Sequence, residues 1–66
     1  MKVEIKVSGI LSKDWEMMFE GMDIIQDGNI SIIKADVPDT SYLHGILNLI
    51  RDLNLKLLSL NTEDNK

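Results

Sequence analysis

The feature that most constrains the fold is a tight turn between two β-rich runs. Asp27-Gly28-Asn29 separates an apolar run at residues 23–26 from a second run at residues 30–37. An Asp-Gly pair in this setting is typical of a β-hairpin, because glycine adopts the positive φ that a two-residue turn requires. We therefore expect two antiparallel strands, of which the second ends before Pro38.

The second strand of this hairpin has two faces, and the sequence indicates which one is buried. One face carries Ser31, Ile33, Ala35 and Val37, and the other carries Ile30, Ile32, Lys34 and Asp36. The last two residues of the second set are polar, so we expect that set to point outward. The two isoleucines then lie on the outer face of the sheet, and Ile25 joins them if Ile24 points inward. The alternative is a register slip by one residue, which would bury both isoleucines.

The chain before the hairpin predicts a strand and then a short helix. Apolar and charged residues alternate over residues 2–7, which is typical of a strand with one solvent-exposed face. Ser12 is the expected N-cap of a helix of two to three turns that ends near Gly21. The apolar stripe of this helix follows the spacing i, i+3, i+4, i+7 and should face the sheet; it consists of Trp15, Met18, Phe19 and Met22.

The chain after the hairpin predicts a longer helix and a last strand. Asp39 can cap this helix, whose apolar residues recur at helical spacing: Leu43, Ile46, Leu47, Ile50 and Leu53. Asn54 follows the last of them, where a residue that tolerates positive φ is needed. Gly45 lies inside the helix at a cost of about 1 kcal/mol relative to alanine. We expect another backbone, such as the first strand, to approach it closely; an approaching ligand is the alternative. Residues 55–61 predict a strand, and residues 62–66 a flexible polar tail.

These elements predict a fold of the α+β class. The order β-α-β-β-α-β with a central hairpin is typical of a ferredoxin-like plait, a four-stranded antiparallel sheet with two helices on one face. The expected strand order is 4-1-3-2. The expected domain is a single one over residues 1–61, followed by the tail.

Composition and charge exclude several classes of function. The 66 residues carry a net charge of −4 with scattered lysines and arginines, which argues against nucleic acid as a partner. No apolar run approaches the roughly 20 residues that span a bilayer, so no membrane association is expected. The alternating first residues do not resemble a secretory signal, so we expect a cytoplasmic protein. The chain has no cysteine, and its acidic residues and single histidine lack metal-site spacing, so we expect no metal and no cofactor.

The chain resembles a family of short, functionally uncharacterised, mostly bacterial proteins. The residues that carry the resemblance are Trp15 with Phe19-Glu20-Gly21-Met22-Asp23-Ile24, Asp39 with Leu43-His44-Gly45, Ile50-Arg51-Asp52-Leu53, and Leu57-Leu58-Ser59-Leu60-Asn61. Members of that family usually have Gln-Ala-Ala in place of Thr40-Ser41-Tyr42, and glycine in place of Ala35 and Asn54. The resemblance implies one compact domain and no particular activity.

Three residues of the second helix could form a binding site. His44, Asn48 and Arg51 lie at i, i+4 and i+7 on one side of that helix, and such a strip could hold a small anion. The alternative is structural: His44 packs at the boundary of the core, and Arg51 with Asp52 forms ion pairs near the helix end. No cysteine nucleophile and no serine in an elbow motif is present, so we expect no catalytic residues and no enzyme.

The function hypothesis that follows rests on the outer face of the sheet. Three large apolar side chains would be exposed together on this face, those of Ile25, Ile30 and Ile32. Small monomers rarely leave such a patch exposed to solvent. We expect a non-enzymatic interaction module that self-associates through this face, as a homo-oligomer with a dimer favoured, or that binds another protein there. The alternative is a small-ligand-binding regulatory domain with the ligand at a subunit junction. An enzyme with His44 as its base is a third hypothesis.

Overall fold

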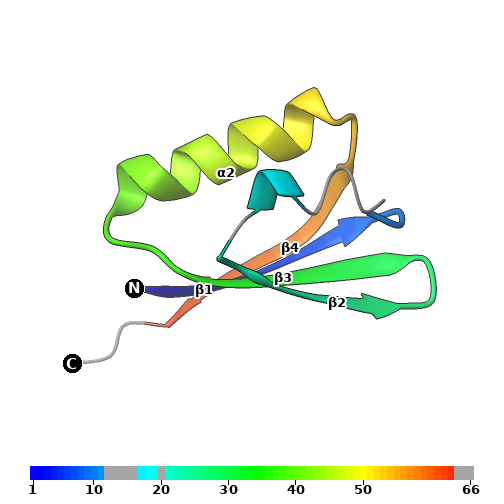
Figure 1. Cartoon of the computed structure of the whole chain (residues 1–66), viewed down its shortest axis with the longest axis horizontal. Coiled ribbons are helices and arrows are strands. Elements are labelled where there is room, and N and C mark those ends of the chain that lie inside the picture. The colour runs from blue at the N-terminus through cyan, green and yellow to red at the C-terminus, as the bar shows by residue number, and fades with distance from the viewer. Residues whose placement is uncertain (12–16, 20, 64–66) are drawn as a thin grey trace.

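One antiparallel sheet with a helix across one face makes up the architecture (Figure 1). The computed structural model describes residues 1–11, 17–19 and 21–63. The strands are β1 (Lys2–Ser8), β2 (Asp23–Asp27), β3 (Ile30–Asp36) and β4 (Lys56–Glu63). Their order across the sheet is β2-β3-β1-β4, and every neighbouring pair is antiparallel. The predicted strand order 4-1-3-2 is therefore confirmed.

The predicted hairpin and its facing are both confirmed. Asp27 pairs with Ile30, which leaves Gly28 and Asn29 as a two-residue turn. Gly28 has φ +61° while Asn29 has a negative φ, the pattern of a type II′ turn with glycine at its first central position. Ser31 and Ile33 are fully buried, so their neighbours Ile30 and Ile32 point to the outer face. The alternative of a slipped register is wrong.

The core lies between the sheet and helix α2 (Thr40–Asp52). Its members come from the strands, the helix and the connecting segments and are Val3, Ile5, Val7, Leu11, Phe19, Ile33, Val37, Leu43, Ile46 and Ile50. The side chain of Asp39 accepts a hydrogen bond from the Tyr42 N–H at 2.8 Å, so the predicted N-cap is confirmed. Asn54 has φ +63° and ends the helix in the left-handed conformation, as predicted.

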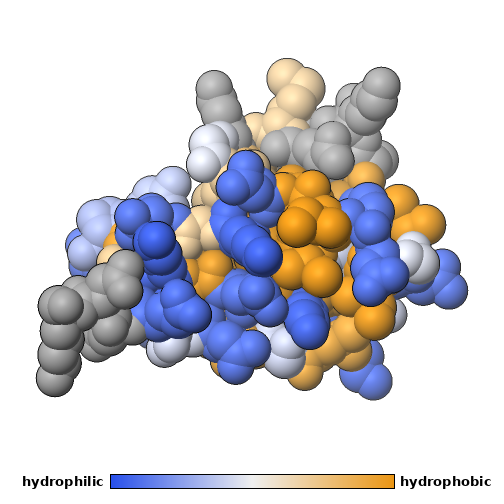
Figure 2. Space-filling model, turned by 90° about the horizontal axis from the view of Figure 1, so that it is seen from below, coloured by the Kyte–Doolittle hydropathy of each residue, from blue (hydrophilic) through white to orange (hydrophobic). Residues whose placement is uncertain are grey.

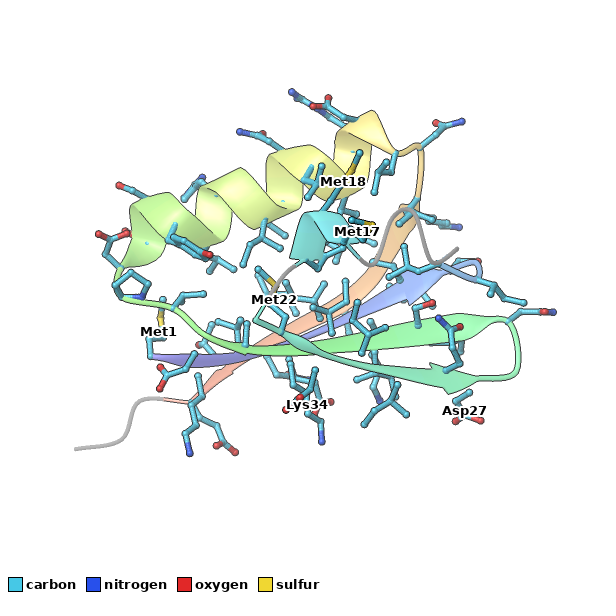
Figure 3. All side chains as sticks on the ribbon, viewed as in Figure 1. Met1, Met17, Met18, Met22, Asp27 and Lys34 are labelled. Carbon is cyan, nitrogen blue, oxygen red and sulfur yellow. The ribbon has the colours of Figure 1, made fainter. Side chains whose placement is uncertain are left out.

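The crossover from β1 to β2 differs from the predicted helix. Its described residues form only a 3-10 turn, η1 (Met17–Phe19), followed by a further turn in which the Met22 N–H donates to the Phe19 carbonyl at 3.1 Å. Phe19 is buried and Met22 packs against the core, but Met17 and Met18 are 77% and 55% exposed. Figure 3 shows both methionines on the helix side of the sheet. The predicted cap Ser12 and core residue Trp15 lie outside the described residues.

The ferredoxin-like fold class is therefore wrong, because α2 is the one α-helix that the described residues contain. The physical reason lies in the short crossover. Gly9 and Gly21 adopt φ values of +118° and +83°, which an α-helix cannot contain, so they bound the crossover, and its described residues 17–19 form a 3-10 turn. A 3-10 turn has three residues per turn, so only one of three successive side chains can face the core, and here that residue is Phe19.

Two further expectations need correction. Strand β4 ends at Glu63 rather than at residue 61, because Thr62 and Glu63 pair with Val3 and Lys2 of β1. The predicted close approach of a backbone to Gly45 is also wrong: a Cβ added there would meet nothing within 4 Å. Gly45 lies on the exposed side of α2, and nothing in the structure explains why this position is a glycine.

Candidate interaction surface

The face of the sheet opposite α2 is divided into an apolar part and a charged part (Figure 2). The strand pairings arrange its side chains in rows that cross the strands. Ile25 of β2 lies directly opposite Ile32 of β3, and Ile30 occupies the next outward position along β3. Ile25 is 46% exposed, whereas Ile30 and Ile32 are partly covered by their neighbours in the sheet. We call these three side chains the isoleucine patch.

In the charged part of the face, acidic and basic side chains alternate across the strands, and we call this set the charged ladder. One row across the strands reads Asp23, Lys34, Glu4, and the next row reads Asp36, Lys2, Glu63. Each lysine thus lies between two carboxylates from neighbouring strands, and the Lys34 Nζ is 3.9 Å from the Glu4 Oε2. Opposite charges in directly paired positions stabilise a sheet by about 0.2–1 kcal/mol per pair.

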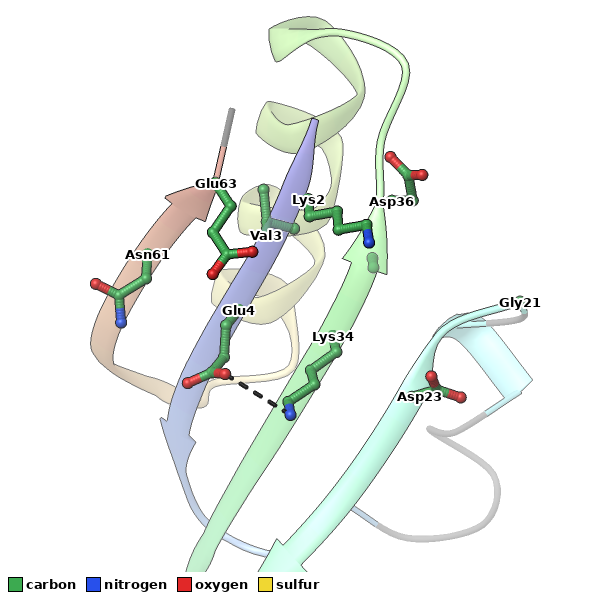
Figure 4. Close-up of a pocket in the computed structure, with 10 residues that line it drawn as sticks. Lys2, Val3, Glu4, Gly21, Asp23, Lys34, Asp36, Asn61 and Glu63 are labelled. Atoms are coloured by element: carbon green, nitrogen blue, oxygen red, sulfur yellow. Dashed lines mark ion pairs between the residues drawn. The ribbon is translucent and has the colours of Figure 1, made fainter. Parts of the chain in front are cut away.

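An open hollow of about 720 Å³ lies over this ladder, at the end of the sheet near the chain termini (Figure 4). Besides the six charged residues, its lining consists of Val3, Gly21, Ala35 and Asn61. Two of its carboxylates form ion pairs, Glu4 with Lys34 and Asp36 with the Met1 amino group at 3.3 Å, so these charges contribute to the sheet without a ligand. The described residues contain no group of three or more histidine, cysteine, aspartate or glutamate side chains placed to hold a metal ion.

The predicted ligand-binding residues lie on the opposite side of the molecule. His44, Asn48 and Arg51 are all exposed on α2 and share one side of the helix, as their spacing predicts. His44 and Asn48 line neither of the two hollows. Arg51 borders a second hollow, of about 310 Å³, between the end of α2 and the start of β4. That hollow is lined mainly by apolar side chains, from Leu47, Ile50, Leu55 and Leu57.

Sequence reasoning missed the exposed apolar side chains of β4. Leu57 and Leu58 are each 45% exposed and Leu60 is 37% exposed, on a strand at the edge of the sheet. The signal for this surface was present in the run Leu57-Leu58-Ser59-Leu60 combined with the predicted strand order, which already placed the last strand at an edge. An apolar edge strand is a surface that proteins usually blunt or cover.

The fold and its surfaces define a small α+β domain whose sheet is covered by a helix on one face only. The sequence profile of a family described as a domain of unknown function, DUF8691, matches residues 2–61. The chain therefore belongs to this family of uncharacterised proteins, as the resemblance implied. A search of curated proteins and a search of solved structures each found no match. The one described α-helix is too short to cross a bilayer.

Proposed function

We propose that this protein is a non-enzymatic interaction module that forms homo-oligomers through the outer face of its sheet. The observation that carries the proposal is the isoleucine patch, in which Ile25 and Ile32 lie side by side on the face that α2 does not cover. An isologous dimer brings the same patch of both copies together about a two-fold axis. The patch then forms the buried centre of the contact, and the charged ladder lies at its rim.

The size of the molecule suits this arrangement. A stable interface buries about 800 Å² on each partner, and the accessible surface of this chain is 4684 Å². The molecule measures 33 × 20 × 19 Å along its principal axes, so a contact of this size takes up essentially one whole broad face. Each copy carries a net charge of −4, and the copies therefore repel one another at long range. Added salt screens this repulsion, so association through the patch strengthens, or stays constant, as salt is raised.

The absence of enzymatic activity is part of the same proposal. Its support is the position of His44, the one histidine, which is exposed on α2 away from both hollows. A general base needs a bound substrate within hydrogen-bond reach and groups that orient it. The exposed helix surface around His44 supplies no hollow in which a substrate would be held among the described residues.

A ligand-binding regulatory role is the second candidate, and one observation favours it. Arg51 borders the 310 Å³ hollow beside β4, where a guanidinium could bind an anionic group at the edge of an apolar recess. This role predicts that an anionic metabolite raises the melting temperature and that Arg51→Ala removes the shift. An unchanged melting temperature of the wild-type chain across a panel of phosphorylated and carboxylated metabolites would contradict it.

The test of self-association uses single substitutions in the full chain. Ile25→Lys and Ile32→Lys each place a charge in the centre of the proposed contact, and both should give a lower mass by light scattering. Met17→Lys is the matched control, since it exchanges an exposed apolar side chain for lysine on the other side of the sheet, and its mass should equal that of the wild type. Circular dichroism verifies that each variant is folded. A folded Ile25→Lys variant with wild-type mass would overturn the proposal.

We further propose that the protein acts in the cytoplasm and that its family is mostly bacterial. The support for the first point is the position of β1, which lies between β3 and β4. Residues 2–8 are thus a central strand of the folded domain. Fractionation of cells that express the chain tests this location, and recovery in a secreted fraction would contradict it.

A further inference from the structure

Strand β4 has an open edge. It pairs with β1 on one side, and on its other side no described residue forms a neighbouring strand. The backbone N–H and C=O groups on that side are free to pair with another strand. Strand β2 has an open edge at the other side of the sheet, so the two edges can be compared directly.

The side chains of β4 leave apolar surface open beside this edge. Leu57 and Leu60 pair with the buried residues Val7 and Ile5, so they point toward the side of the sheet that carries α2. They are nevertheless 45% and 37% exposed. The 310 Å³ hollow lies beside Leu57. A strand and a helix added beyond this edge would cover these leucines.

The charges at the two ends of β4 are complementary in an antiparallel pair. Lys56 is opposite Ser8 and Glu63 is opposite Lys2, and both of these β1 residues are on the outer face. Residues seven positions apart lie on opposite faces of a regular strand, but the register shift between Lys6 and Val7 brings Lys56 and Glu63 to the same face. Two antiparallel copies of β4 therefore place Lys56 beside Glu63 of the partner subunit, at both ends of the pair.

At the edge formed by β2, by contrast, the charges of two antiparallel copies repel one another. Asp23 and Asp27 are opposite Lys34 and Ile30 of β3, so both carboxylates point to the outer face. An antiparallel pair of β2 strands would bring Asp23 of one copy beside Asp27 of the other. Like charges at such positions are destabilising. The charge pattern thus opposes self-pairing at β2 and favours it at β4.

A buried hydroxyl group near the middle of β4 also lacks a partner. The Ser59 Oγ is buried and has no hydrogen-bond partner among the described residues. An unsatisfied buried polar group destabilises a fold, and such a group needs a physical explanation. Ser59 is opposite Lys6, on the outer face, as is Asn61 opposite Glu4. In an antiparallel pair, the Asn61 amide of the partner subunit comes to the same face near Ser59 and can supply the missing hydrogen bond.

We propose that a second copy of this chain pairs with β4 edge to edge and forms a continuous eight-stranded sheet. This contact is separate from the one through the isoleucine patch, because Ile25 lies on β2 at the far edge of the sheet. Both contacts are two-fold, and both can form at once. Edge-paired dimers then stack through their outer faces, and where the two axes meet at right angles the assembly closes with four chains.

The test removes the outer-face contact first, so that the two proposals fail independently. In an Ile32→Lys background, the chain should still form a dimer through β4. Lys56→Glu in this background places two carboxylates together at each end of the strand pair, and it should weaken the dimer about tenfold or more. Glu63→Lys should weaken it similarly. The double variant Lys56→Glu/Glu63→Lys restores the opposite charges and should restore the dimer.

The salt dependence of the dimer and a control variant give two further tests of the pairing through β4. The dimer through β4 should weaken as salt is raised, because its end contacts are ion pairs. Tyr42→Lys is the matched control; Tyr42 is 49% exposed on α2, and its replacement should leave the dimer intact. A folded Ile32→Lys chain that is monomeric at every concentration overturns the edge pairing and leaves the outer-face proposal standing. Equal weakening by the two single variants and by the double variant also overturns it.

Discussion

The crossover between β1 and β2 gives a prediction that separates the observed 3-10 turn from the helix that the sequence pattern favours. A helix with a stripe of Met18, Phe19 and Met22 would bury all three side chains against the sheet. In the structure, Phe19 is 1% exposed whereas Met18 is 55% exposed. The neighbouring residues Met18 and Phe19 should therefore respond very differently to truncation.

The magnitudes follow from burial. Phe19→Ala removes a buried aromatic ring and should lower the free energy of unfolding by about 3–5 kcal/mol. A chain of this length has a total stability of roughly 3–10 kcal/mol, so this variant loses a large part of its stability and is unfolded if that stability lies near the lower end. Phe19→Leu keeps most of the apolar volume and should cost about 1–2 kcal/mol. Met18→Ala changes an exposed side chain and should alter the stability by less than about 0.5 kcal/mol.

The assay is urea denaturation followed by far-ultraviolet circular dichroism, with thermal melting as a second measurement. A loss of 1 kcal/mol lowers the melting temperature of a domain of this size by about 4–8 °C. Phe19→Leu should therefore shift the melting temperature clearly, and Met18→Ala should leave it almost unchanged. If Met18→Ala costs as much as Phe19→Leu, Met18 is buried in solution and the 3-10 turn is refuted.

Three further predictions concern stability away from the crossover. Asp39→Ala removes the acceptor of the Tyr42 N–H and should cost about 1 kcal/mol in urea denaturation; an unchanged midpoint would contradict the cap. Asn54→Gly should raise the melting temperature, since glycine adopts φ +63° without a steric penalty, and a lower melting temperature would be evidence against the left-handed conformation there. Ser31→Ala removes a buried hydroxyl that donates to the Gly9 carbonyl at 2.7 Å, and a cost of about 1–3 kcal/mol is expected; no cost would show that this carbonyl finds another donor.

The parts of the fold that sequence reasoning predicted are those fixed by local chemistry. The turn at Gly28 is set by the φ preference of glycine, and the facing of β3 is set by its period-two pattern. The N-cap at Asp39 needs only a side chain that reaches an N–H three residues ahead. The strand order followed from these elements and their connections.

The parts that sequence reasoning could not predict depend on contacts between distant segments. An apolar stripe at residues 15–22 is compatible with a helix, but its described part at residues 17–19 forms a 3-10 turn that buries Phe19 against the sheet. The register shift in β4 arises from its pairing with β1 and has no signature in β4 alone. The apolar patch of the candidate surface was predictable, whereas the charged ladder required the register of all four strands.

The measurement that tests self-association most directly is the solution mass of the untagged, full-length chain by light scattering over a wide range of concentrations, at low and high salt. We expect a mass well above that of one 7.5 kDa chain, rising toward the mass of four chains as the concentration increases. A chain that remains a 7.5 kDa monomer at every concentration and salt would contradict both the contact through the isoleucine patch and the pairing of β4.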